Sequence, residues 1–116
     1  MTIRRINPGP RMSQASVHGG LVFLAGQVAD DASADVAGQT RQILAKIDAV
    51  LAEAGSDKSR ILSTTIWLSD IGTFGEMNSV WDAWVDKGSP PARATVEARL
   101  AAPAFKVEIA AVAAVA

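Results

Sequence analysis

The hydrophobic positions of the chain change their period several times along its length. Near the N-terminus, two segments rich in β-branched and aromatic residues, SQASVH and LVFLAGQV, read as strands joined at Gly19 and Gly20. Such a glycine pair is typical of a two-residue hairpin turn. Gly26, inside the second strand, indicates a bulge or a close approach of the backbone to another group. A shorter strand, TIRRI, would precede the hairpin and end at the turn-forming NPGP.

Two later segments show the three- and four-residue spacing of amphipathic helices. The first runs over residues 34–54 and ends at Gly55, a favourable C-terminal residue. The second runs over residues 71–88 and ends at Gly88. The apolar stripe of the first helix contains Val36, Ile43, Leu44, Ile47, Val50 and Leu51, and that of the second contains Phe74, Met77, Trp81, Trp84 and Val85.

The remaining segments alternate apolar and polar residues with the period of strands. RILSTTIWLSD separates the two helices, ARATVEARL follows a double proline, and FKVEIAAVAAV closes the chain. The predicted order is strand–strand–strand–helix–strand–helix–strand–strand. Each helix has one face to bury, so we expect a single domain over 1–116, an α+β two-layer sandwich with both helices on one face of a mixed sheet. The strands that flank the second helix should be parallel, with a right-handed crossover.

The last strand is apolar on both of its faces apart from Glu108. This pattern is typical of a strand that is covered on both sides. Two helices can cover only one face of the sheet, and another copy of the same chain is the simplest cover for the other face. We therefore expect a homo-oligomer.

Composition and charge exclude several classes of function. The formal net charge of −1 offers no basic excess for nucleic acid, and the absence of cysteine excludes disulfides and thiolate chemistry. His18, beside the glycine pair, should be a surface hairpin residue, and Asp30 and Asp31 should be solvated loop residues. Neither a glycine-rich phosphate loop nor a set of metal ligands is present, so we expect no cofactor and no metal. No signal peptide or membrane-spanning run is visible, which predicts a cytoplasmic protein without membrane contact.

Glu108 is the residue that most calls for a chemical explanation. Burying a carboxylate in an apolar strand is costly unless it is paired or hydrogen-bonded. Arg93 begins the strand segment expected to neighbour it and is the natural candidate for proximity. One interpretation is a structural Arg93–Glu108 ion pair at a subunit contact. The other is a site in which the planar guanidinium of Arg93 holds a substrate carboxylate and Glu108 holds a water, for hydrolysis of a small carboxylic acid. The residues themselves do not identify the bond that is broken.

Three blocks of the sequence carry a family resemblance. MSQASVHGGLVFLAGQV, STTIWLSDIGTFGEMNSVWDAW and PPARATVEARLAAPAFKVEIAAVAA resemble, in this order, the blocks of the reactive-intermediate deaminase family (RidA, or YjgF/YER057c/UK114). The most specific block is the last, in which Glu108 lies fifteen residues after Arg93. The WDAWV helix and the KVEI ending are most similar to the short YoaB-like members.

The resemblance implies a chorismate-mutase-like fold and a homotrimer with its sites at subunit boundaries. It implies cofactor-independent hydrolysis of 2-imino acids, such as 2-iminobutanoate and 2-iminopropanoate, to 2-keto acids and ammonia. In that family Arg93 would bind the substrate carboxylate and Glu108 would position the attacking water. Gly26, Asn78 and Thr95 match positions at the substrate pocket.

Two pocket positions depart from the family pattern. Met12 stands where many members have an aromatic residue, and Ala25 replaces a common serine or threonine. In addition, a proline common in the loop after Leu100 is displaced to Pro103. These departures motivate an alternative hypothesis, a trimer that binds small keto or amino acids without turning them over. Ribonuclease activity, attributed to some members, is a third hypothesis, which the lack of a basic patch disfavours.

Overall fold

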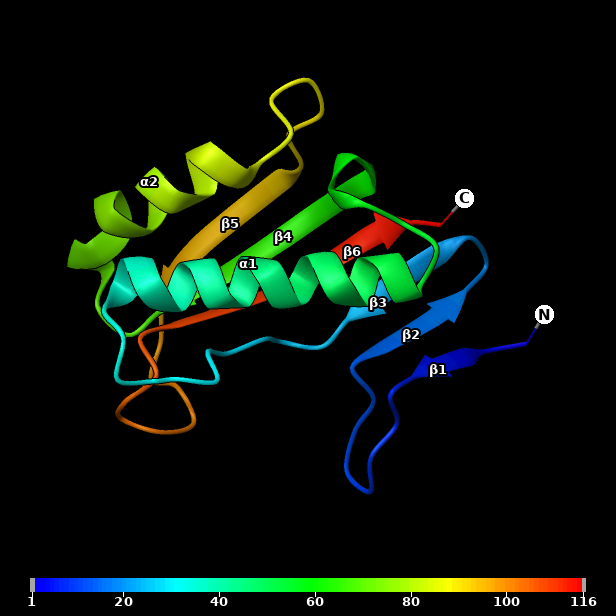
Figure 1. Ribbon diagram of the computed structural model, residues 1–116, viewed down its shortest axis with the longest axis horizontal. Helices are drawn as coiled ribbons and strands as arrows, with labels where there is room; N and C mark the ends of the chain where they lie inside the picture. Colours follow the sequence, from blue (N-terminus) through cyan, green and yellow to red (C-terminus); the bar gives the residue numbers. More distant parts are fainter. Residues whose placement is uncertain (1, 116) are drawn as a thin grey trace.

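Six strands form one mixed sheet, and two helices lie on one of its faces (Figure 1). The structure, a computed structural model, describes residues 2–115. The elements are β1 (Arg4–Ile6), β2 (Ala15–His18), β3 (Leu21–Leu24), α1 (Val36–Glu53), β4 (Ile61–Leu68), α2 (Phe74–Trp84), β5 (Ala92–Glu97) and β6 (Val107–Ala114), with short 3-10 turns at Lys58–Arg60 and Ile71–Thr73. The order of strands in the sheet is β1-β2-β3-β6-β4-β5. The predicted α+β two-layer fold is therefore confirmed.

The hairpin and the parallel crossover both occur where the sequence predicts them. Gly19 and Gly20, with φ of 61° and 81°, join β2 to β3. A type I′ hairpin turn, whose twist matches that of the flanking strands, requires positive φ at both of its central residues. β4 and β5, which flank α2, are the parallel pair, and the other neighbouring strands are antiparallel. Within residues 2–115 no helix combines the length and hydropathy needed to cross a bilayer.

The first helix matches its prediction, whereas the second is shorter than predicted. The Asp35 side chain caps α1 by accepting a hydrogen bond from the backbone N–H of Gly38 at 2.8 Å, and Gly55 follows the helix with φ of 79°. The second helix spans Phe74–Trp84, not residues 71–88. It ends because Val85, with φ of −59° and ψ of 143°, leaves the helical conformation, and because the carboxylate of Asp86 accepts a hydrogen bond from the N–H of Gly88 in place of helical bonding.

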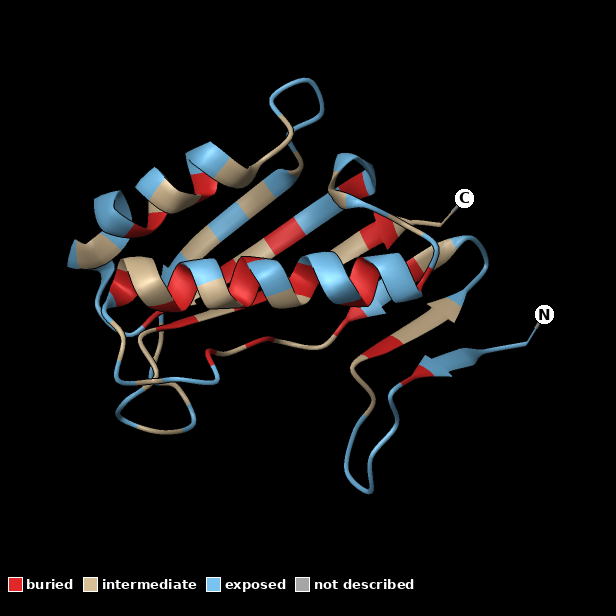
Figure 2. Ribbon diagram, viewed as in Figure 1, coloured by how far each residue is buried: buried red, intermediate tan, exposed pale blue. Residues whose placement is uncertain are grey.

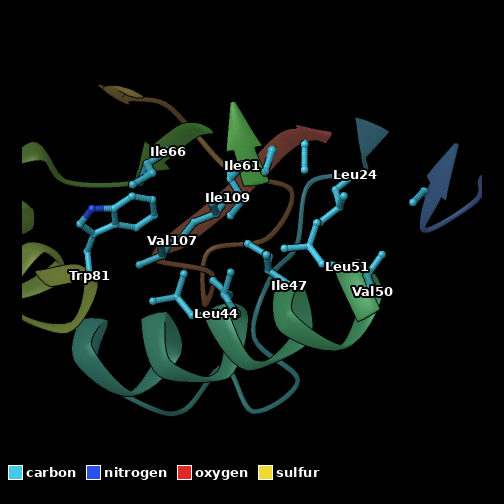
Figure 3. Close-up of a cluster of buried hydrophobic side chains, with 14 of the residues drawn as sticks. Leu24, Leu44, Ile47, Val50, Leu51, Ile61, Ile66, Trp81, Val107 and Ile109 are labelled. Carbon is cyan, nitrogen blue, oxygen red and sulfur yellow. The ribbon is translucent and has the colours of Figure 1, made fainter. Parts of the chain in front are cut away.

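The hydrophobic core lies between α1 and the sheet, with α2 closing one side. The inward stripe of α1 is buried and its outer face is exposed (Figure 2). Figure 3 shows the side chains of this stripe meeting those of the sheet, with the Trp81 indole of α2 at one end of the cluster. The fully buried members of the core include Val22, Ile43, Leu44, Ile47, Leu51, Ile66, Leu68, Met77, Val107 and Ile109.

The two faces of the sheet differ in what covers them. We refer to the face under the helices as the covered face and to the opposite face as the open face. Along β6, the covered positions from Val107 onward are buried and the open positions from Glu108 onward are half-buried, in strict alternation. The open face also exposes large apolar side chains, with Phe23 47% and Val96 46% exposed. This apolar surface is the one that a second copy is predicted to cover.

Candidate functional site

The Arg93 side chain lies between β5 and α2, on the covered face of the sheet. Its Nη1 donates a 2.8 Å hydrogen bond to Oδ1 of Asn78. Its guanidinium carbon is 5.2 Å from the ring centroid of Trp81 and 5.7 Å from that of Phe74. We refer to these four residues together with Thr95 as the arginine patch.

The spacing along α2 explains how this patch is assembled. Phe74, Asn78 and Trp81 are separated by four and three residues, so they share one face of the helix. The two rings favour a cation in this place, and the amide oxygen of Asn78 fixes one edge of the guanidinium. The other N–H groups of the half-buried Arg93 can still donate hydrogen bonds. A guanidinium needs two such N–H groups to bind a carboxylate in a bidentate manner. The sequence predicted Arg93 and Asn78, but it assigned the aromatic residues only to the core.

Thr95 also points to the covered face, since its partner across the ladder is the buried Ile66. Its hydroxyl oxygen is buried and has no hydrogen-bond partner among residues 2–115. The same is true of Thr64 on β4, the ladder partner of Arg93, which sequence reasoning did not single out. The only signal that could have identified Thr64 is a threonine in place of an apolar residue at an inward strand position.

Glu108 lies on the other side of the sheet, against the backbone that follows β3. An added Cβ on Gly26 would lie 2.1 Å from Oε2 of Glu108, so a side chain at residue 26 would overlap the carboxylate. Reciprocal backbone hydrogen bonds of 2.8 and 3.1 Å between Gln27 and Ile109 hold the two segments together. The close approach predicted for Gly26 is confirmed, and its partner is the glutamate.

We refer to Gly26 and Glu108, with the adjacent Ala25, as the glutamate patch. The N–H of Ala25 donates to the carbonyl of Gln14 at 2.9 Å, which connects the end of β3 to the loop that carries Met12. Met12 is 49% exposed. Within the described part of the chain Glu108 forms no ion pair. The patch therefore presents a half-buried carboxylate beside backbone.

The arginine patch and the glutamate patch do not meet within one chain. β4 lies between β5 and β6, and Arg93 pairs with the buried Thr64 whereas Glu108 pairs with Trp67, a residue of the opposite face. The expectation that Arg93 and Glu108 lie on neighbouring strands is therefore wrong. Two surface hollows of about 560 and 410 Å³ contain neither residue. A site that uses both side chains needs two copies of the chain.

The remaining candidates lie away from both patches. His18 is exposed at the β2–β3 turn, and Asp30 pairs with Nζ of Lys46 at 2.9 Å. Hydrogen bonds from the side chain and backbone N–H of Ser33 lower the pKa of Asp31, and those of Ser59 lower the pKa of Asp57. Among residues 2–115, acidic, histidine and cysteine side chains form no group of three or more that would suit a metal ion.

The fold and the two patches define a small α+β domain with a half-buried arginine on one face of the sheet and a glutamate on the other. The family model described as Endoribonuclease L-PSP matches residues 2–115. The RutC family protein YoaB of Escherichia coli is 48% identical over 115 residues, covering 99% of this chain and 100% of that protein. A RutC family protein of Haemophilus influenzae is 48% identical over 110 residues, covering 94% of this chain and 95% of its own length.

A solved structure of a YjgF family member from Neisseria meningitidis agrees in fold as well as sequence. It superimposes with a TM-score of 0.97 at 49% identity, covering 100% of this chain and 97% of that one. The chain therefore belongs to the RidA/YjgF family, whose members also carry the names RutC and L-PSP. The family resemblance inferred from the sequence is confirmed.

Proposed function

We propose that the protein hydrolyses 2-imino acids, of the 2-iminobutanoate and 2-iminopropanoate type, to 2-keto acids and ammonia without a cofactor. The observation that carries this proposal is the placement of Arg93 and Glu108 on opposite faces of one sheet. In a ring of identical copies, a heterologous contact brings one face of a subunit against the other face of its neighbour. In the homotrimer proposed here, Arg93 of one copy and Glu108 of the next line a common cleft.

The reaction needs orientation and one proton carrier. Arg93 holds the substrate carboxylate through its free N–H groups, while Asn78 keeps the guanidinium in place. Glu108 accepts a proton from water as the water oxygen bonds to the imine carbon, the C=N π electrons move to nitrogen, and Glu108 passes this proton to the nitrogen. The resulting carbinolamine then collapses. Glu108 accepts the hydroxyl proton and delivers it to the amino group, the C=O bond forms as the C–N bond breaks, and ammonia and the keto acid leave.

The other residues of the two patches shape the cleft. Gly26 leaves the Glu108 carboxylate room beside the backbone, and the main chain around residues 25 and 26 supplies polar groups next to the water. Met12 and Ala25 line the side occupied by the substrate's aliphatic group, and Thr95 lies beside the guanidinium. A smaller, less polar lining suits short aliphatic imines.

A coupled assay tests the proposal. An amino-acid oxidase generates the imino acid in situ, and its decay is followed with several amino-acid precursors. We expect Arg93→Ala and Glu108→Ala each to lower kcat/KM by a factor of about 100 or more, as the loss of a charge-assisted contact and of a proton acceptor implies. The exposed Arg41→Ala serves as the matched control and should retain wild-type activity.

Two outcomes would contradict the proposal. Wild-type kcat/KM in Arg93→Ala would show that the guanidinium does not hold the substrate. Binding of 2-ketobutanoate in calorimetry without any imine hydrolysis would favour the alternative, a ligand-binding trimer whose Met12 and Ala25 replace the usual ring and hydroxyl. We do not propose cleavage of RNA, because a chain of net charge −1 has no basic excess to bind it.

A further inference from the structure

Two threonine hydroxyls beneath α2 are buried without a hydrogen-bond partner among residues 2–115. They are Oγ1 of Thr64 on β4 and Oγ1 of Thr95 on β5. Thr64 is only 2% exposed. Buried polar groups in native proteins are almost always hydrogen-bonded, to protein or to ordered water. Two exceptions at neighbouring positions therefore indicate a shared partner.

Both threonines adjoin Arg93 on the covered face of the sheet. Thr64 is the ladder partner of Arg93, and Thr95 is the next residue on the same face of β5. The position across from Thr95 is the fully buried Ile66. The three polar side chains thus occupy adjacent positions on the covered face, beside the apolar Ile66.

Valine has nearly the same size and shape as threonine, and both residues are β-branched and favour strands. A hydroxyl that replaces a methyl group in such a place lowers stability unless it gains a hydrogen bond. This cost in stability would arise at both Thr64 and Thr95. A polar partner that serves both hydroxyls removes this cost at both positions.

We propose that one ordered water bonds to Oγ1 of Thr64, to Oγ1 of Thr95 and to an N–H group of Arg93. Three partners are typical of a buried water. The water accepts from Arg93 and from one hydroxyl and donates to the other, so every group keeps its ordinary role. Asn78 holds the guanidinium through Nη1, and the water holds it at a second point. Thr64 is thereby a positioning residue for Arg93.

The functional consequence rests on the proposed function of the arginine patch. A guanidinium held at two points presents its fork to a carboxylate in one orientation, whereas one held only by Asn78 can rotate. Glu108 lies on the opposite face and is unaffected by this rotation. Loss of the water should therefore weaken carboxylate binding and raise KM, with little change in kcat.

The first experiment is a thermal-unfolding cycle with Thr64→Val, Thr95→Val and the double variant. We expect each single variant to lower Tm by about 4 °C or more, and the double variant to lower it by clearly less than the two shifts combined, because the water leaves with the first hydroxyl. Thr64→Ser keeps the hydroxyl and should stay near the wild-type Tm. Valine variants that raise Tm additively would overturn the proposal, since the hydroxyls would then have no polar partner to lose.

The second experiment measures 2-ketobutanoate binding by calorimetry and KM in the coupled imine assay. Thr64→Val should weaken binding and raise KM by about three- to tenfold, and Thr64→Ser should restore both. Thr40→Val is the matched control, because Thr40 is also buried but its hydroxyl bonds to the carbonyl of Val36 at 2.7 Å, within α1. Its Tm should fall while its binding constant stays at the wild-type value.

The two proposals fail in different ways. A wild-type protein that hydrolyses no imine contradicts the proposed function. The unfolding cycle and 2-ketobutanoate binding would still test whether the ordered water bridges Thr64, Thr95 and Arg93. An active wild-type protein whose Thr64→Val variant binds and turns over substrate normally contradicts the positioning role of Thr64 alone.

Discussion

Mixing two inactive variants should restore activity, because the two patches of one chain face in opposite directions. The perturbations are Arg93→Ala, which removes the guanidinium, and Glu108→Ala, which removes the carboxylate. Neither homogeneous variant can form a complete site. A mixed assembly can, wherever a Glu108→Ala copy supplies its arginine patch to the glutamate patch of an Arg93→Ala copy.

The expected recovery follows from the arrangement of the patches. Each chain carries one arginine patch and one glutamate patch, on opposite faces. In a random 1:1 mixture, half of the sites receive an intact arginine and half of these receive an intact glutamate. About one quarter of the wild-type activity should therefore return, whatever the number of copies in the ring.

The assay is the oxidase-coupled decay of the imino acid after the two variants are unfolded and refolded together. Wild type mixed 1:1 with the Arg93→Ala/Glu108→Ala double variant is the control. A shared site predicts about a quarter of the activity of undiluted wild type in this mixture, whereas a site within one chain predicts about a half. Refolded mixtures of the single variants that remain as inactive as their components would refute the shared site.

Further predictions concern the contacts that support the two patches. Gly26→Ala should lower kcat/KM about tenfold or more, because the new Cβ displaces the Glu108 carboxylate, whereas Gly75→Ala in α2 meets no atom within 4 Å and should leave activity unchanged. Asn78→Ala should raise KM about tenfold or more, since it removes a hydrogen bond of roughly 1.5–3 kcal/mol to the guanidinium. Gln39→Leu should lower the free energy of unfolding in urea by about 2–4 kcal/mol, since the buried amide bonds three carbonyls and one N–H.

The elements of the fold were largely predictable because each has a local signal. The extent of α1 follows from its apolar period and from Gly55, and the β2–β3 hairpin follows from its glycine pair. The end of α2 was predicted less well. The side chain of Asp86 accepts a hydrogen bond from the N–H of Gly88 in place of a helical carbonyl, and Gly88 itself resembled a residue that terminates a helix.

The relation between the two patches was not predictable, because it depends on the order of the strands. Alternation along β5 separates Arg93 and Thr95 from the alanines but does not say which set lies beneath a helix. Polar residues usually face away from the core. Here α2 supplies Asn78 and two aromatic rings to the guanidinium, so the polar side of the strand is the covered one.

A tryptophan lies in the arginine patch and another lies beside the glutamate patch, so intrinsic fluorescence can report on each of them. The Trp81 ring lies 5.2 Å from the guanidinium carbon of Arg93, so its emission should respond to an anion bound there. Trp67 is the ladder partner of Glu108 on the open face, so its emission should respond when that face leaves water. The third indole, Trp84, lies 5.4 Å from that of Trp81. Ligand binding and association can thus be followed separately, without a label, by replacing one indole at a time with phenylalanine.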